Sequence, residues 1–324
     1  MSGAGLFLVA LFGSTARLAA PLILAAFAGL YAERSGVVDI GLEGKLLFGA
    51  FAGAAVAALS GSAAAGLTAA VAAGMLLSLL HGWAGIALGG DQIVSGMALN
   101  LVAAGAAPSL ASAWFHQGGA TPPLAAGARF APIALPFAGA LQGVPVLGPV
   151  YHDVLSGQSL PVYLAWLAVP ATAFILARTR WGLRLRAVGE SPEAIAAAGI
   201  SVKGLRWGAL ALGGALCGIG GAALSMAMGN GFLRGMSAGR GYLALAALIF
   251  GKWRPWPVLA ACLFFAAADA LATRLEGLAL PGFGALPVEL IEALPYVVTV
   301  VVLAGFAGAA RPPRALGKPH PPMR

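Results

Sequence analysis

Long apolar runs, separated by short polar or Pro/Gly-rich segments, dominate the chain. About 20 apolar residues span a bilayer as a helix, and the pattern predicts nine helical segments, the second and the seventh of them short: 6–31, 45–60, 63–88, 93–115, 160–177, 207–228, 242–250, 256–273 and 288–306. The runs are continuous and do not alternate with polar residues, which excludes a membrane β-barrel. We therefore expect an all-α, polytopic transmembrane helical bundle in the lipid bilayer.

The composition supports a membrane protein. Of the 324 residues, 60% are hydrophobic and 9% are charged, whereas a soluble domain carries roughly 25% charge. A water-soluble fold and a disordered chain are both excluded. The net charge of +8 does not indicate a nucleic-acid partner, because surplus Lys and Arg are typical of cytoplasmic loops in membrane proteins. Cys217 and Cys262 lie inside apolar segments, which favours core packing over a disulfide or a metal site.

The distribution of basic residues predicts the orientation and the domain organisation. Six lie between residues 178 and 206 and four between 311 and 324, but only one lies between 116 and 159. By the positive-inside rule, the first two regions are cytoplasmic and the third is external. We expect one membrane domain at 1–310 and a cytoplasmic C-terminal tail at 311–324. The tail is rich in proline and is predicted to be disordered.

A run of glycines marks the segment 207–228. Small residues let membrane helices approach closely where no hydrophobic force drives them together. The glycines at positions 213, 214, 218, 220 and 221 therefore predict a packing seam between helices and not a binding site.

Residues for enzymatic chemistry are scattered. The four histidines have no metal-ligand spacing and form no triad with a nucleophile. Gly44-Lys45 and Gly251-Lys252 lack the upstream glycine and the following Ser or Thr of a phosphate-binding loop. We expect no enzymatic activity, no metal and no cofactor in this chain, so uphill transport would need a partner or an ion gradient.

Two polar segments each precede a short apolar segment. One runs from Glu33 to Lys45 and the other from Ser237 to Gly241. Short, Gly-interrupted segments in corresponding halves of a chain indicate a transport path near the membrane midplane, although two ordinary interhelical loops are the alternative. Aligning Glu43 with Arg240 also aligns Gly44 with Gly241, which suggests two pseudo-repeated halves. Charges at membrane depth face a cavity or each other, so an ion pair between Glu43 and Arg240 is one hypothesis and two solvated surface charges are the other.

The basic loop contains a capped short helix. Ser191 is a good N-cap, Pro192 suits the first helical position, Glu193 complements the helix dipole and Gly199 suits the C-terminal end. A helix of two turns is unstable alone in water, so we expect it to dock on another protein. Binding to lipid headgroups is the alternative, and the alanine-rich stretch 194–198 offers little apolar bulk for it.

At these same positions the chain resembles the ABC-importer permeases of the nucleoside and simple-sugar group. The matching segments are 33–44, 91–100, 186–200 and 238–251, in order within a resemblance that covers residues 14–303. The resemblance implies a second homologous permease subunit, an ATP-binding subunit that holds ATP and Mg, and an external or lipoprotein substrate-binding protein. It also implies a purine nucleoside or related ribosyl compound as the solute.

The resemblance assigns two sets of residues. It implies a substrate path at Glu33, Asp39, Gly41, Glu43, Gly44, Asp91, Gln92, Asn100, Gly239, Arg240 and Gly241, and coupling to the ATPase at Glu190, Ser191, Pro192, Glu193, Ala194, Ala197 and Gly199. Asp39, Lys45 and Asp91 stand where the family pattern leads us to expect Asn, Met and a neutral residue. The expected path therefore carries charges that the family pattern lacks.

The sequence therefore predicts a multi-pass permease subunit in the bacterial inner membrane that imports a purine nucleoside by alternating access, driven by a separate ATPase. A permease of the same architecture for simple sugars or branched-chain amino acids is one alternative. An ion-coupled secondary transporter that works alone is another, and the predicted docking helix argues against it.

Overall fold

The computed structural model describes residues 3–136, 144, 147–275, 279–280, 284–285, 297 and 311–318. The main helices are α1 (Gly3–Arg34), α2 (Leu42–Ser60), α3 (Ala63–Gly82), α4 (Gln92–Phe115), α7 (Leu160–Arg178), α8 (Arg180–Glu190), α9 (Pro192–Ala197), α10 (Val202–Ala222), α11 (Arg240–Phe250) and α12 (Pro255–Leu275). Two π-helical turns extend α3 and α10, namely η1 (Trp83–Ala87) and η4 (Ala223–Met228). The connection after α4 contains η2 (Ala126–Ala128), α6 (Leu147–Pro149) and η3 (Val150–Leu155), and β1 (Ala279–Leu280) pairs with β2 (Gly284–Ala285) after α12.

The all-α membrane bundle is confirmed. Seven helices of the described chain are long and apolar enough to cross a membrane, and α11 is a shorter apolar helix of 11 residues. The expectation that the second segment is short was wrong, because α2 begins at Leu42 and reaches 19 residues. The ninth expected segment, 288–306, lies outside the described residues apart from position 297.

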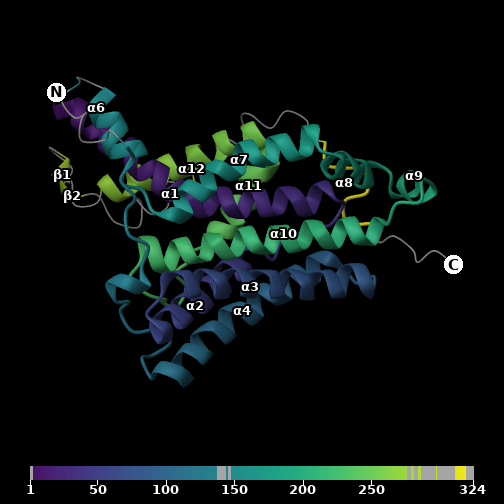
Figure 1. Cartoon of the computed structure of the whole chain (residues 1–324), viewed down its shortest axis with the longest axis horizontal. Coiled ribbons are helices and arrows are strands. Elements are labelled where there is room, and N and C mark those ends of the chain that lie inside the picture. Colours follow the sequence, from purple (N-terminus) through teal and green to yellow (C-terminus); the bar gives the residue numbers. More distant parts are fainter. Residues whose placement is uncertain are drawn as a thin grey trace.

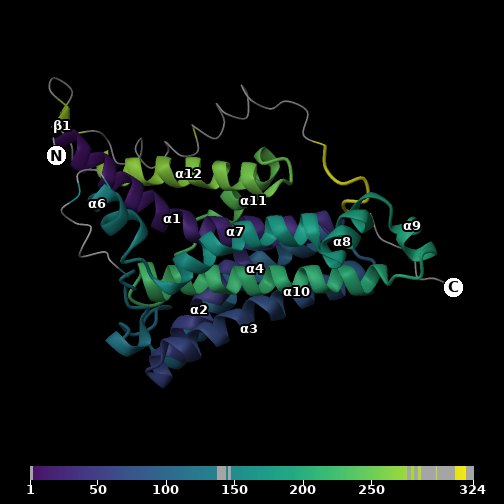
Figure 2. The ribbon, with the colours of Figure 1, turned by 45° about the horizontal axis from the view of Figure 1, so that its top comes forward.

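The long helices lie side by side along the long axis of the molecule (Figure 1). α8, α9 and the last described residues lie at one end, which we call the α9 end. The N-terminus, α6 and the β1–β2 hairpin lie at the opposite end, which we call the α6 end (Figures 1 and 2). α1 packs against α7, α10, α11 and α12, and its residues Ile23, Leu24 and Phe27 are fully buried in the main core.

The predicted glycine seam on α10 is confirmed. A Cβ atom at Gly214 would lie 2.5 Å from the carbonyl oxygen of Gly74 in α3, and one at Gly221 would lie 2.5 Å from the carbonyl oxygen of Leu46 in α2. These separations leave room for hydrogen only, so the glycines allow three helix backbones to pack directly against one another.

Two irregular links interrupt this packing. Residues 35–41 join α1 to α2, and residues 229–239 join η4 to α11. α1 ends beside α8, where Gly189 packs on the Arg34 carbonyl, and the adjacent α10 begins at that same end. The two long helices thus run in opposite directions, and each leads through a link into the helix that follows it. The N-termini of α2 and α11 then meet, because Gly241 contacts the backbone of Glu43.

The described part of the C-terminal tail is packed. The Ala315 amide donates to the Gly189 carbonyl (2.8 Å), the Gly317 amide donates to the Gly36 carbonyl (3.0 Å), and Arg206 donates to the Lys318 carbonyl (3.2 Å). The predicted disorder was therefore wrong for residues 311–318. The prolines do prevent a helix, but the turn at residues 314–317 finds hydrogen-bond partners at the ends of α1 and α8.

Candidate functional site

Glu43 connects α2 to the start of α11, where the two irregular links meet. It lies in the first turn of α2, and its carboxylate accepts the backbone N–H groups of Gly239 (2.9 Å) and Gly241 (2.7 Å) at the start of α11. The first N–H groups of a helix have no partner within the helix, and the N-terminal end of the helix dipole favours a negative charge. Glu43 therefore caps α11 from a different helix.

Asn100 of α4 fixes the other side of this junction. Its side-chain oxygen accepts the Gly44 amide (2.8 Å), and its side-chain nitrogen donates to the Ile40 carbonyl (3.0 Å) and the Tyr242 hydroxyl (3.2 Å). Gly44 must be small here, since a Cβ atom would lie 2.9 Å from the Asn100 Cα. One amide side chain thus holds the 35–41 link, α2 and α11 together.

A cavity of about 440 Å³ lies at this junction. Its polar lining groups come from Glu43, Asn100, Ser237 and Tyr242, together with the backbone around Gly239. Leu47, Met97 and Leu101 are among the residues that supply its apolar wall. A cavity with a few convergent polar groups and an apolar wall is typical of a small-molecule site.

Asp39 and Lys45 form a buried ion pair that does not line the cavity. The Lys45 ammonium lies 2.7 and 2.6 Å from the two carboxylate oxygens of Asp39, and both side chains are fully buried. Gly41, between them in sequence, packs against Gly96 of α4. Two of the three charges that depart from the family pattern therefore neutralise each other and add no net charge to the cavity.

His81 and Gln92 hold the middle of the 35–41 link, at Val38. The two ring nitrogens of His81 lie 3.1 Å from the Ser95 hydroxyl and 2.8 Å from the Val38 carbonyl, and Gln92 accepts the Val38 amide at 2.7 Å. Gln92 belongs to the expected path, but it lines no part of the cavity and instead positions the link. His81 was not among the expected path residues, although an ionisable residue within an apolar span is itself a functional signal.

Two other expected path residues lie away from the cavity. Glu33 accepts the indole N–H of Trp253 at 2.6 Å, and the neighbouring Arg34 donates to the Trp253 carbonyl, so both hold the turn between α11 and α12. Asp91 is exposed and caps α4 by accepting the amides of Ile93 and Val94. Their local role is to secure helix ends.

Glu43 and Arg240, which could pair in one state of a transport cycle, do not form an ion pair in this structure. Arg240 lies 3.4 Å from the Asp269 carboxylate of α12 and donates to the Met236 carbonyl. Glu43 instead uses both oxygens on backbone N–H groups, which the charge pattern of the sequence did not reveal. Asp269 is a second ionisable residue within a span that the sequence analysis did not select.

The short helix of the basic loop forms as predicted. The Ser191 hydroxyl accepts the Ala194 amide (3.4 Å), Pro192 opens α9, and Gly199 follows it with φ +74°. Pro192 is buried, whereas the other residues of the expected coupling surface are exposed: Glu190, Ser191, Glu193, Ala194, Ala197 and Gly199. α9 projects beyond the ends of the long helices (Figure 1).

Comparisons with known proteins agree with this architecture. The family described as "Branched-chain amino acid transport system / permease component" matches residues 11–309. The chain is 36% identical to a nucleoside ABC transporter permease protein, NupC, of Lactococcus lactis, over 92% of each chain. It is 38% identical to the guanosine ABC transporter permease protein NupQ of Bacillus subtilis, over 93% of each chain. It is 33% identical to a putative glucose ABC transporter permease protein, TsgC13, of Haloferax volcanii, over 92% of each chain.

No solved structure matches the chain. The family match covers nearly all of the bundle, from the first turns of α1 to beyond α12. Members of this family are transport subunits, and no cluster of three or more metal-ligating side chains occurs within the described residues. The chain therefore belongs to the permease family described as "Branched-chain amino acid transport system / permease component".

Proposed function

We propose that this chain is the permease subunit of an ABC importer for purine nucleosides in the bacterial inner membrane. The cavity at the junction of α2 and α11 carries this proposal. Irregular backbone at membrane depth is tolerated only where it is buried in protein or lines a cavity. Here two links meet beside one cavity, which is the arrangement expected of a transport path.

The cavity chemistry suits a nucleoside. A nucleoside presents a flat base with donors and acceptors and a ribose with hydroxyl groups. The exposed ring of Tyr242 offers a surface for stacking, and its hydroxyl group can donate a hydrogen bond. The Glu43 carboxylate and the side-chain oxygen of Asn100 can accept hydrogen bonds from ribose hydroxyl groups. The names of the Lactococcus and Bacillus relatives support the same solute class.

The remaining components follow from what the chain leaves exposed. We propose that α9 docks on the separate ATPase subunit, which binds ATP and Mg and drives alternating access. The second permease subunit would cover the face of α4, where Val94, Met97 and Leu101 are more than half exposed. An external substrate-binding protein would deliver the solute at the α6 end.

This proposal places the α9 end and the C-terminus in the cytoplasm, because ten basic residues lie in the two regions 178–206 and 311–324. Single cysteines at Ser191 and at exposed Gln117, in the loop after α4, test the orientation. An impermeant thiol reagent on intact cells should label only the second, and both should react after permeabilisation. The native cysteines are buried and give a low background. Labelling of the Ser191 cysteine in intact cells would reverse the topology.

Uptake of radiolabelled guanosine tests the solute. Cells that express the importer should accumulate guanosine, and unlabelled adenosine or guanosine in large excess should compete, whereas glucose and leucine should not. Glucose is included because one relative is named for glucose transport, and leucine because of the family description. Competition by glucose alone would assign a sugar permease, and uptake that persists without the ATPase subunit would favour an ion-coupled carrier.

A further inference from the structure

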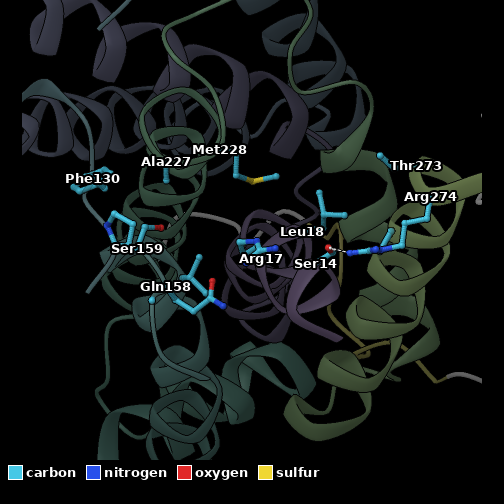
Figure 3. Close-up of a pocket in the computed structure, with 14 residues that line it drawn as sticks. Ser14, Arg17, Leu18, Phe130, Gln158, Ser159, Ala227, Met228, Thr273 and Arg274 are labelled. Atoms are coloured by element: carbon cyan, nitrogen blue, oxygen red, sulfur yellow. Dashed lines mark hydrogen bonds between the residues drawn. The ribbon is translucent and has the colours of Figure 1, made fainter. Parts of the chain in front are cut away.

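A second, basic cavity lies at the α6 end, apart from the junction of α2 and α11. It has a volume of about 560 Å³ and is lined by α1, α12, the end of η4 and the segment that leads into α7. Arg17 of α1 and Arg274 of α12 both line it, with Ser14, Gln158 and Thr273 nearby (Figure 3). None of its described lining residues is acidic.

The two arginines have spare hydrogen-bond donors. Arg274 donates to the Ala10 carbonyl (2.8 Å) and to the Ser14 hydroxyl (2.9 Å), and its buried Nε has no partner within the described chain. Arg17 is exposed and makes no ion pair or side-chain hydrogen bond with any described residue. Two guanidinium groups beside one cavity, with no carboxylate among its described lining residues, favour an anionic ligand.

An apolar cavity of about 540 Å³ adjoins the basic one. Its lining includes Phe12, Ala16, Leu155, Trp166 and Leu263. Gln158 lines both cavities, so it marks where they meet. Its side-chain nitrogen donates to the Val154 carbonyl (2.9 Å), while its buried side-chain oxygen has no partner in the described residues. That oxygen is suited to accept a hydrogen bond from a ligand hydroxyl or ammonium group.

The cavities lie at the level where the spans end. Arg274 is the last residue of the α12 span, and Ser159 directly precedes the α7 span. Lipid headgroups occupy this depth of a bilayer, and guanidinium groups bind phosphate groups well. A ligand that fills both cavities needs a charged head and an apolar body.

We propose that the paired cavities bind one anionic phospholipid. The phosphate contacts Arg17 and Arg274, a headgroup hydroxyl donates to the Gln158 oxygen, and an acyl chain occupies the apolar cavity. Because the lipid would contact α1, α7 and α12 at once, it would stabilise the α6 end of the bundle. A free phosphate would satisfy the arginines but leave the apolar cavity unfilled, which is why we assign a lipid.

Lipid binding to the purified importer tests this site. Dioleoylphosphatidylglycerol, dioleoylphosphatidylcholine or inorganic phosphate is added to the delipidated complex in detergent, and retained lipid and unfolding temperature are measured. Only phosphatidylglycerol should be retained and raise the unfolding temperature. Arg17→Gln should weaken its binding about tenfold, the effect of losing roughly 1.4 kcal/mol of interaction free energy.

Arg17→Gln is the decisive variant, because Arg17 has no side-chain partner among the described residues and its loss should not disturb the fold. Arg274→Gln should weaken binding too, but it also breaks hydrogen bonds to α1. Arg129→Gln is the matched control, since it removes an exposed arginine in the loop after α4 that lines neither cavity. It should bind lipid as the unmodified protein does.

Three results would overturn the assignment. Unchanged phosphatidylglycerol binding by Arg17→Gln would remove the arginine from the site. Equal binding of phosphatidylcholine would show that the headgroup charge is not recognised. Stabilisation by inorganic phosphate alone, without a further effect of lipid, would show a free-anion site.

Discussion

The cap that Glu43 provides for α11 can be tested by one conservative change. Glu43→Gln keeps the shape of the side chain but removes its charge. In the unmodified protein, the Glu43 carboxylate accepts hydrogen bonds from two backbone N–H groups, at 2.9 and 2.7 Å. Glutamine has only one acceptor oxygen, so one bond becomes a weaker neutral bond, and the amide NH₂ group faces the other N–H donor.

The size of the effect follows from these contacts. A hydrogen bond to a charged group contributes about 1.5–3 kcal/mol, and a buried donor without a partner costs about 1–3 kcal/mol. Glu43 is only half-buried, so water can reach the site and the lower values apply. We expect Glu43→Gln to lower the free energy of unfolding by about 2 kcal/mol. If the cap sets the geometry of the path, guanosine uptake should fall about tenfold, since each 1.4 kcal/mol corresponds to a factor of ten.

The assay compares purified variants by denaturant unfolding and cells by initial uptake at equal expression. Asp91→Asn is the matched control, because it makes the same carboxylate-to-amide change at an exposed helix cap. Asn caps a helix about as well as Asp, so both stability and uptake should stay near their original values. Unchanged uptake and stability in Glu43→Gln would refute the capping argument.

A charge swap distinguishes the cap from an ion pair. Glu43→Arg combined with Arg240→Glu would restore a pair of opposite charges, but it would place a guanidinium against two N–H donors. We therefore expect no recovery of uptake relative to Glu43→Arg alone. Recovery in the double variant would show that Glu43 and Arg240 interact directly during the transport cycle.

Three further changes test the surroundings of the cavity and the docking helix. Gly241→Ala should abolish uptake, because the added Cβ overlaps the backbone of α2, whereas Gly105→Ala in α4 meets no atom within 4 Å and should leave uptake unchanged. Lys45→Met should lower the free energy of unfolding by about 3–5 kcal/mol, since it leaves the buried Asp39 carboxylate unpaired. Adding Asp39→Asn should restore most of the lost stability. Equal stability of the single and double variants would contradict the ion pair. Ala194→Trp on exposed α9 should abolish uptake without changing the unfolding midpoint, and full uptake in this variant would remove the docking role.

The main features of the fold could be predicted from the sequence. Apolar length predicted the spans because lipid offers the backbone no hydrogen bonds, so each span must be a helix of nearly fixed length. The capped α9 could also be predicted, because Ser191, Pro192 and Gly199 act on backbone groups within a few residues of themselves. The seam on α10 followed from glycine alone, because only that residue permits such close backbone contact.

The candidate site was predictable in position but not in its contacts. Glu43, Gly44 and Gly239 do meet at one cavity, as the broken-helix pattern indicated, and Asn100, which the family resemblance implied, lines the same cavity. Glu33 and Asp91, however, secure helix ends elsewhere. A charge next to a glycine in sequence does not reveal whether it faces a cavity, caps a helix or pairs with a neighbour.

Only the tertiary structure decided the partners of the polar groups. Glu43 accepts hydrogen bonds from backbone amides that lie 196 and 198 residues further along the chain. The C-terminal segment forms hydrogen bonds with the backbone of Gly36 and Gly189. Local sequence determined which segments are helices, because helix hydrogen bonds and caps act within a few residues. Partner choice between helices depends on their rotation and depth in the bundle, and these are set by the packing of all the helices together.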